Sequence, residues 1–191
     1  MFRLKISKFV DNNYRVMQTH NVFKRKKTIS KFLWVSNDKK LDNNISRSIS
    51  SIFSITSFNK FTYFYTQTID SIYARTDLKS LIKKFNLITR QLRQHYKDKQ
   101  FYYLLIPEYH EDGQNWHLHG FLSKDYDILS YINRNGFKEL AQFDKLGFNS
   151  ISKIRNYGAC CKYVTKYVTK DLIKNFNKGD KFYYCSQRTC T

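Results

Sequence analysis

Residues 115–120 read Asn115-Trp116-His117-Leu118-His119-Gly120, within a short apolar run that predicts a β-strand from Trp116 to Leu122. Side chains alternate between the two faces of a strand, so His117 and His119 should project from one face and Leu118 from the other. Two imidazoles held side by side can bind one metal ion. The spacing alone does not separate a metal site from a pair of solvent-exposed histidines, so partners elsewhere in the chain must decide.

The segment before these histidines predicts a partner strand. Residues 101–106 are aromatic and aliphatic, and the polar loop at 110–113 would turn the chain back into a hairpin. A hairpin can bring Glu108 beside both imidazoles, and His110 competes with it for the place of third ligand. Two histidines and one carboxylate form a mixed nitrogen and oxygen site that suits Mn²⁺ or Mg²⁺, and Zn²⁺ or Co²⁺ can also bind there.

The remaining hydrophobic pattern indicates an α+β fold. The predicted elements are a strand at 61–69, a helix at 78–92, a short helix at 127–133, a strand at 147–154, a helix at 156–175 and a strand at 182–185. This order is typical of a ferredoxin-like or RRM-like sandwich, in which helices flank a central antiparallel sheet. We expect the compact domain to span residues 58–191, preceded by a basic N-terminal extension at residues 1–57.

The charge and composition of the chain favour a nucleic-acid partner. The sequence has 34 Lys and Arg against 15 Asp and Glu, a net charge of +19, together with 15 Tyr and 16 Phe. Such a surface attracts polyanions, and its aromatic rings can stack on unpaired bases. No segment is apolar and long enough to span a membrane, and the four cysteines have no CxxC spacing, so we expect a cytoplasmic protein with reduced thiols.

A second candidate site lies on the predicted helix near the C-terminus. At 3.6 residues per turn, one stripe of this helix carries two phenols and two ammonium groups, from Tyr163, Lys166, Tyr167 and Lys170. The roughly opposite stripe is apolar and should anchor the helix; it consists of Cys161, Val164, Val168 and Leu172. Taken alone, the polar stripe is also compatible with a solvated helix surface.

The histidines and the tyrosines together suggest a reaction. A tyrosine oxygen can attack a DNA phosphodiester and form a covalent phosphotyrosine if the phosphate charge is offset and the phenol is deprotonated. A metal ion would polarise and orient the phosphate, and a neighbouring lysine would stabilise the developing negative charge. The energy of the phosphodiester is kept in the covalent link, so the strand can be rejoined without ATP.

These residues resemble the motifs of a known family. His117-Leu118-His119 is similar to the motif of the HUH endonucleases, and the doubled Tyr-x-x-Lys at 163–170 resembles that of two-tyrosine rolling-circle replication initiators from phages and plasmids. Residues 64–68, Phe-Tyr-Thr-Gln-Thr, loosely resemble the first motif of the family. The resemblance implies a five-stranded antiparallel sheet and a divalent metal at Glu108, His117 and His119.

The implied activity is cleavage of single-stranded origin DNA, which leaves the 5′ end on tyrosine and a free 3′-OH that primes synthesis. Tyr163 and Tyr167 would alternate as nucleophiles with Lys166 and Lys170 beside them, and the order of the two tyrosines stays open. The expected partners are an origin strand and a host helicase and polymerase in the bacterial cytoplasm, with no membrane and no small-molecule substrate. The residues expected to contact DNA are Tyr65, Gln67, Trp116 and Lys162.

Two alternative functions remain at the level of sequence. A single-tyrosine transposase or a relaxase would share the histidine motif. A non-catalytic module that binds single-stranded nucleic acid could use the exposed aromatic face of a similar sheet, and it would need neither a metal nor a tyrosine helix.

Overall fold

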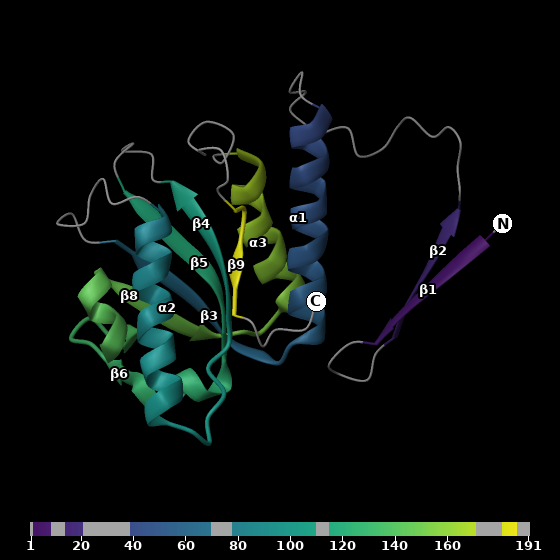
Figure 1. Cartoon of the computed structure of the whole chain (residues 1–191). Helices are drawn as coiled ribbons and strands as arrows, with labels where there is room; N and C mark the ends of the chain where they lie inside the picture. The colour runs from purple at the N-terminus through teal and green to yellow at the C-terminus, as the bar shows by residue number, and fades with distance from the viewer. Residues whose placement is uncertain are drawn as a thin grey trace.

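The computed structural model describes residues 2–8, 14–20, 39–69, 78–109, 115–170 and 181–186. Its main feature is a five-stranded antiparallel sheet with the strand order β8-β3-β5-β4-β9 (Figure 1). The strands are β3 (Phe61–Thr68), β4 (Tyr103–Tyr109), β5 (Trp116–Ser123), β8 (Asn149–Lys153) and β9 (Tyr184–Cys185). The expected α+β fold, with helices around an antiparallel sheet, is therefore confirmed.

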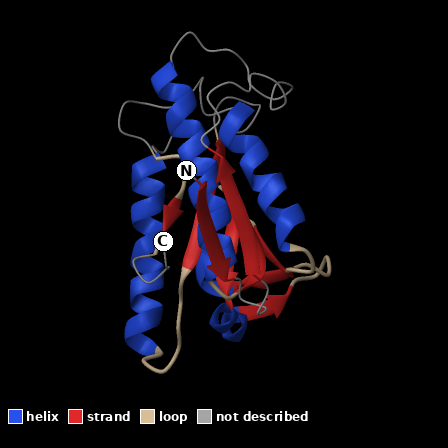
Figure 2. Cartoon of the chain, turned by 90° about the vertical axis from the view of Figure 1, so that its right-hand side faces the viewer, coloured by secondary structure: helices blue, strands red, loops and turns tan. Residues whose placement is uncertain are grey.

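Helices cover both faces of this sheet, as Figure 2 shows. The helix α2 (Leu78–His95) packs on one face, and α1 (Lys39–Phe58) and α3 (Tyr157–Lys170) pack on the other. No helix in the described part of the chain is long and apolar enough to cross a membrane.

The core beneath α2 is mainly aromatic. Phe85 of α2 is fully buried, and its ring lies 5.0 Å from that of Tyr103 and 4.7 Å from that of Phe143 between ring centroids. Alternation along β3 directs Tyr63 and Tyr65 into the same core. The apolar stripe of α2, with buried residues at spacings of three and four, is the reason this helix could be predicted from sequence.

The opposite core joins α1 and α3 to the sheet. Ile52 and Ile55 of α1 are buried there with Val164 of α3, and the Thr56 hydroxyl lies 3.0 Å from the Cys161 sulfur. Burial raises the pKa of the Cys161 thiol. The helix α1 was not predicted, because its many Ser and Asn residues have low helix propensity and tertiary burial must stabilise it. The predicted boundary between an extension at 1–57 and a domain at 58–191 stays a prediction.

The shorter elements lie between β5 and α3 and at the N-terminus. Between β5 and α3 the structure has two 3₁₀ helices, Lys124–Leu129 and Ala141–Leu146, and a hairpin of β6 (Ser130–Ile132) and β7 (Lys138–Leu140). The predicted helix at 127–133 was therefore wrong beyond residue 129. The chain turns instead at Gly136, whose φ of +81° suits glycine. At the N-terminus, β1 (Phe2–Lys8) pairs with β2 (Tyr14–His20).

Candidate metal and tyrosine site

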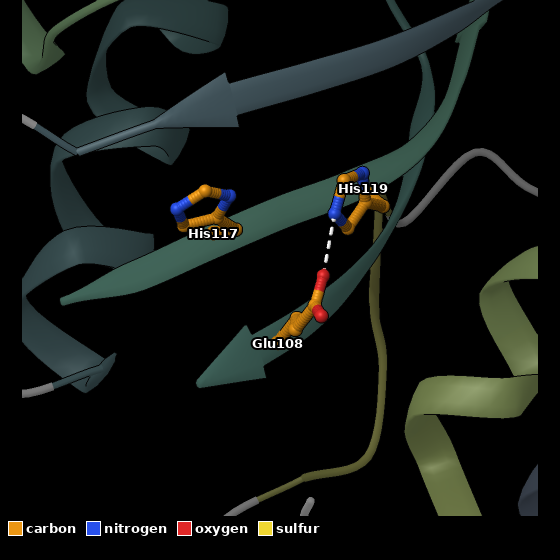
Figure 3. Close-up of side chains that lie close together, drawn as sticks. All are labelled: Glu108, His117 and His119. Atoms are coloured by element: carbon orange, nitrogen blue, oxygen red, sulfur yellow. Dashed lines mark hydrogen bonds and ion pairs between the residues drawn. The ribbon is translucent and has the colours of Figure 1, made fainter. Parts of the chain in front are cut away.

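The paired strands β4 and β5 bring the predicted ligands together. Glu108 is the register partner of His117, and the Oε2 atom of Glu108 lies 2.7 Å from Nε2 of His119 (Figure 3). One ligand atom from each of Glu108, His117 and His119 lies within 4.8 Å of the others. The antiparallel pairing that places them confirms the predicted partnership of the two strands, and these residues form a group that can hold a metal ion.

The next strand, β3, supports the second histidine. Thr66 is the register partner of His119, and its hydroxyl oxygen lies 3.2 Å from Nδ1 of that ring. Both nitrogens of His119 are thus engaged, with Glu108 on one side and Thr66 on the other. Contacts of this kind fix the orientation and tautomer of a histidine ligand. Sequence reasoning missed Thr66, although the alternation of residues in β3 puts Thr66 and Gln67 on opposite faces.

Phe64 forms an apolar wall next to the histidines. Its ring stacks near His119 at 6.3 Å and meets the rings of Phe121 and Tyr163 edge to face at 5.7 and 5.8 Å. Phe64 therefore contacts both the histidine strand and α3. The sequence placed it in the first motif but assigned it no role in the site.

The helix α3 places both tyrosines against the same histidine. The ring of Tyr167 stacks on His119 with centroids 5.2 Å apart and planes 15° from parallel, and Tyr163 approaches His119 edge-on at 5.6 Å. The two tyrosine rings lie 5.0 Å from each other. Val164 and Val168 on the other stripe are fully buried, which anchors α3 in this orientation. The structure thus brings the two predicted half-sites into one place.

The charged residues of α3 lie on the solvent side of the helix. Lys166 and Lys162 are exposed, and Tyr163 between them is 45% exposed. Lys170 is the last residue of α3, and its predicted role stays a prediction. Lys166 is three residues from Tyr163, so both project from neighbouring positions of the helix surface.

Three of the predicted DNA contacts do not fit the structure. Tyr65 and Gln67 are 0% exposed on the α2 side of the sheet, and Trp116 packs in the same core against Tyr109. Burial raises the pKa of Tyr65 well above its ordinary value, so its phenol stays protonated and donates a hydrogen bond to the side-chain oxygen of Gln67. These side chains stabilise β3 and β5 from below and are not available to a ligand. His110, the alternative third ligand, lies outside the described residues.

Comparison with protein families places these elements in a known context. Residues 62–172 match the model of a family of replication proteins, described as replication-associated protein ORF2. The chain belongs to this family. The matched residues run from β3 to the end of α3, so they include Glu108, both histidines and both tyrosines. No curated protein and no solved structure matches the chain.

Membership in this family makes the chain a replication-associated protein. Together with a glutamate and two histidines that can hold a metal ion, it indicates an enzyme that acts in DNA replication. The HUH-like histidine pair fits the same assignment.

Proposed function

We propose that this protein is a replication initiator that nicks single-stranded DNA at an origin by attack of a tyrosine oxygen. The proposal rests on one observation: the rings of Tyr163 and Tyr167 both contact His119, which in turn contacts Glu108. A phosphate held by the Glu108–His117–His119 group would therefore lie next to two phenols. A solvated tyrosine surface, the alternative for α3, would not need this contact.

The donor set fits a divalent cation. Two imidazole nitrogens and one carboxylate oxygen suit Mn²⁺ or Mg²⁺, and the ligand atoms are close enough to converge on one ion. A bound ion would polarise the scissile phosphate and neutralise part of its charge. In its absence Glu108 and His119 bond to each other, so ion binding must replace that hydrogen bond and should release a proton when His119 is charged.

The residues of this chain then have separate tasks. One tyrosine oxygen forms a bond to phosphorus, the bond from phosphorus to the 3′ oxygen breaks, and that oxygen leaves as the free 3′-OH after taking up a proton. The second tyrosine would repeat the exchange on another strand and so end the cycle by strand transfer. Lys166, beside Tyr163 on the same helix, would offset the negative charge that develops on the phosphate.

A covalent-adduct assay tests this proposal. The protein is incubated with Mn²⁺ and single-stranded oligonucleotides that contain candidate origins, and the products are separated under denaturing conditions. We expect a protein–DNA adduct that the double variant Tyr163→Phe/Tyr167→Phe does not form. The control is Tyr131→Phe, a comparably exposed tyrosine of β6, which should form it normally.

Further variants separate the possible outcomes. His119→Ala should abolish the adduct and largely preserve salt-sensitive DNA binding, which depends on many basic residues. Strand transfer by either single tyrosine variant alone would favour a single-tyrosine transposase or relaxase. DNA binding without any adduct, from any origin and with metal bound, would leave a non-catalytic binding module and end the nicking proposal.

A further inference from the structure

A large groove lies at the β9 edge of the sheet, away from the tyrosines. Its volume is about 1090 Å³, and its walls come from α1, α2 and the chain around β9. The edge strand β9, yellow in Figure 1, lies where the α2 side of the sheet meets the α1–α3 side. None of the site residues described above lines this groove.

The charge of the groove has one sign. Arg47 of α1, Arg90 and Arg93 of α2 and Lys181 before β9 line it, and none of its lining residues in the described part of the chain is acidic. The guanidinium of Arg93 donates a hydrogen bond of 2.8 Å to the carbonyl oxygen of Phe101, which fixes the position of this cation in the groove wall. Four cations around one concave surface favour a ligand with several negative charges.

Aromatic side chains lie among these cations. Phe182, Tyr183 and Tyr184 line the groove and are half-buried, and Tyr103 forms part of its wall from the sheet. A basic groove with aromatic rings binds single strands well, because phosphates are neutralised while unpaired bases stack on the rings. The bases of a duplex already stack on each other, and an acidic protein would use the charges but not the aromatic faces. The combination therefore favours single-stranded DNA over these alternatives.

We propose that this groove binds a second segment of the single-stranded DNA that the tyrosine site nicks. The inference rests on the proposed function for the identity of the ligand. The strand β4 runs from Tyr103 at the groove to Glu108 at the metal site, a backbone distance of about 17 Å at 3.3 Å per residue. At a spacing of 3.4 Å per nucleotide, at least about five nucleotides separate the two contacts. The groove would hold the origin strand in register while the tyrosine site acts on one phosphate.

Charge reversal tests the groove. The double variant Arg47→Glu/Arg90→Glu changes two exposed groove residues, and Arg134→Glu/Lys145→Glu makes the same change of charge at exposed positions outside it. Fluorescence anisotropy measures the Kd of each protein for single-stranded DNA of about 25 nucleotides over a range of salt concentrations, after circular dichroism has shown that both variants fold. We expect the groove variant to bind at least about tenfold more weakly than the control variant. Its salt slope should fall by about 1.4, the value for two lost phosphate contacts on a single strand.

The outcomes are distinguishable from those of the nicking assay, because anisotropy reports binding without chemistry. Weaker binding of the groove variant supports the groove even if the wild-type protein forms no adduct. A groove variant that loses no more affinity than the control variant overturns the groove proposal, whether or not nicking is observed. An equal or larger loss of affinity for duplex DNA than for the single strand also overturns it, because the aromatic rings would then have no role.

Discussion

Gly120 allows β4 and β5 to approach each other directly beside His119, and Gly120→Ala tests how tightly they are packed. A Cβ atom at position 120 would lie 2.0 Å from the carbonyl oxygen of Leu104 and 3.0 Å from Cα of Leu105, both of which belong to the backbone of β4. An ordinary contact begins near 3.4 Å, so the strands would have to separate by at least about 1.4 Å. No side-chain rotation can relieve the overlap.

The energetic cost follows from the sheet hydrogen bonds. Bonds near 2.9 Å stretched by this amount pass 4 Å and are lost. If two such bonds break between central strands, each leaves buried groups without a partner, at about 1–3 kcal/mol. We therefore expect Gly120→Ala to lower the free energy of unfolding by about 2–6 kcal/mol. At roughly 2–4 °C per kcal/mol for a chain of this length, the unfolding midpoint should fall by about 5–20 °C.

Thermal and urea unfolding followed by circular dichroism measures this change. The matched control is Gly158→Ala in the first turn of α3, where the added Cβ would lie 3.4 Å from the side-chain oxygen of Asn156, an ordinary contact. Since alanine is the better helix former, this variant should unfold at or slightly above the wild-type midpoint. If Gly120→Ala and Gly158→Ala unfold within about 1 kcal/mol of each other, the close strand approach does not constrain the fold and the reasoning is refuted.

Three further predictions concern the site, the core and the surface. Thr66→Val removes the hydroxyl next to Nδ1 of His119, so Mn²⁺ affinity measured by calorimetry should fall by about 10- to 100-fold with the fold unchanged; an unaltered affinity would exclude this support. Phe85→Ala, in the fully buried aromatic core, should cost about 3–5 kcal/mol in urea unfolding, and a loss below about 1 kcal/mol would contradict the packing. The hydrogen bond from Lys138 lowers the pKa of the Asp127 carboxyl, so the pair stabilises the fold above the ordinary aspartate pKa of about 4, and this contribution disappears as pH falls through the lower folded value. Because both groups are partly exposed, Asp127→Asn should cost less than about 1 kcal/mol at pH 7 and nothing near pH 2; an equal cost at both pH values would count against the pair.

Much of the site could be predicted because its information is local. Alternation in a strand fixes that His117 and His119 share a face, and helical spacing fixes that Tyr163 and Tyr167 share a stripe. A hairpin between neighbouring strands was enough to select Glu108. Each of these inferences needs only the geometry of one element or of two elements joined by a short loop.

The errors arose where one face of the sheet had to be chosen over the other. Tyr65 and Gln67 belong to a motif strand, and the sequence carried no sign that α2 would cover the face to which they point. Thr66, between them, points to the histidines and was overlooked for the same reason. Propensity also hid α1, whose Ser-rich sequence forms a helix only because Ile52 and Ile55 are buried against α3 and the sheet.

The sequence by itself determined the chemistry of the two half-sites: a glutamate and two histidines suited to a divalent ion, and a helix stripe with two tyrosines and two lysines. Only the tertiary structure decided that the halves meet at His119, because their contact depends on the burial of Val164 and Val168 against the far side of the same sheet. The basic groove at β9 likewise joins residues from α1, α2 and the C-terminal region that are far apart in the chain. Local periodicity carries no information on such packing, which is set by long-range burial of apolar surface.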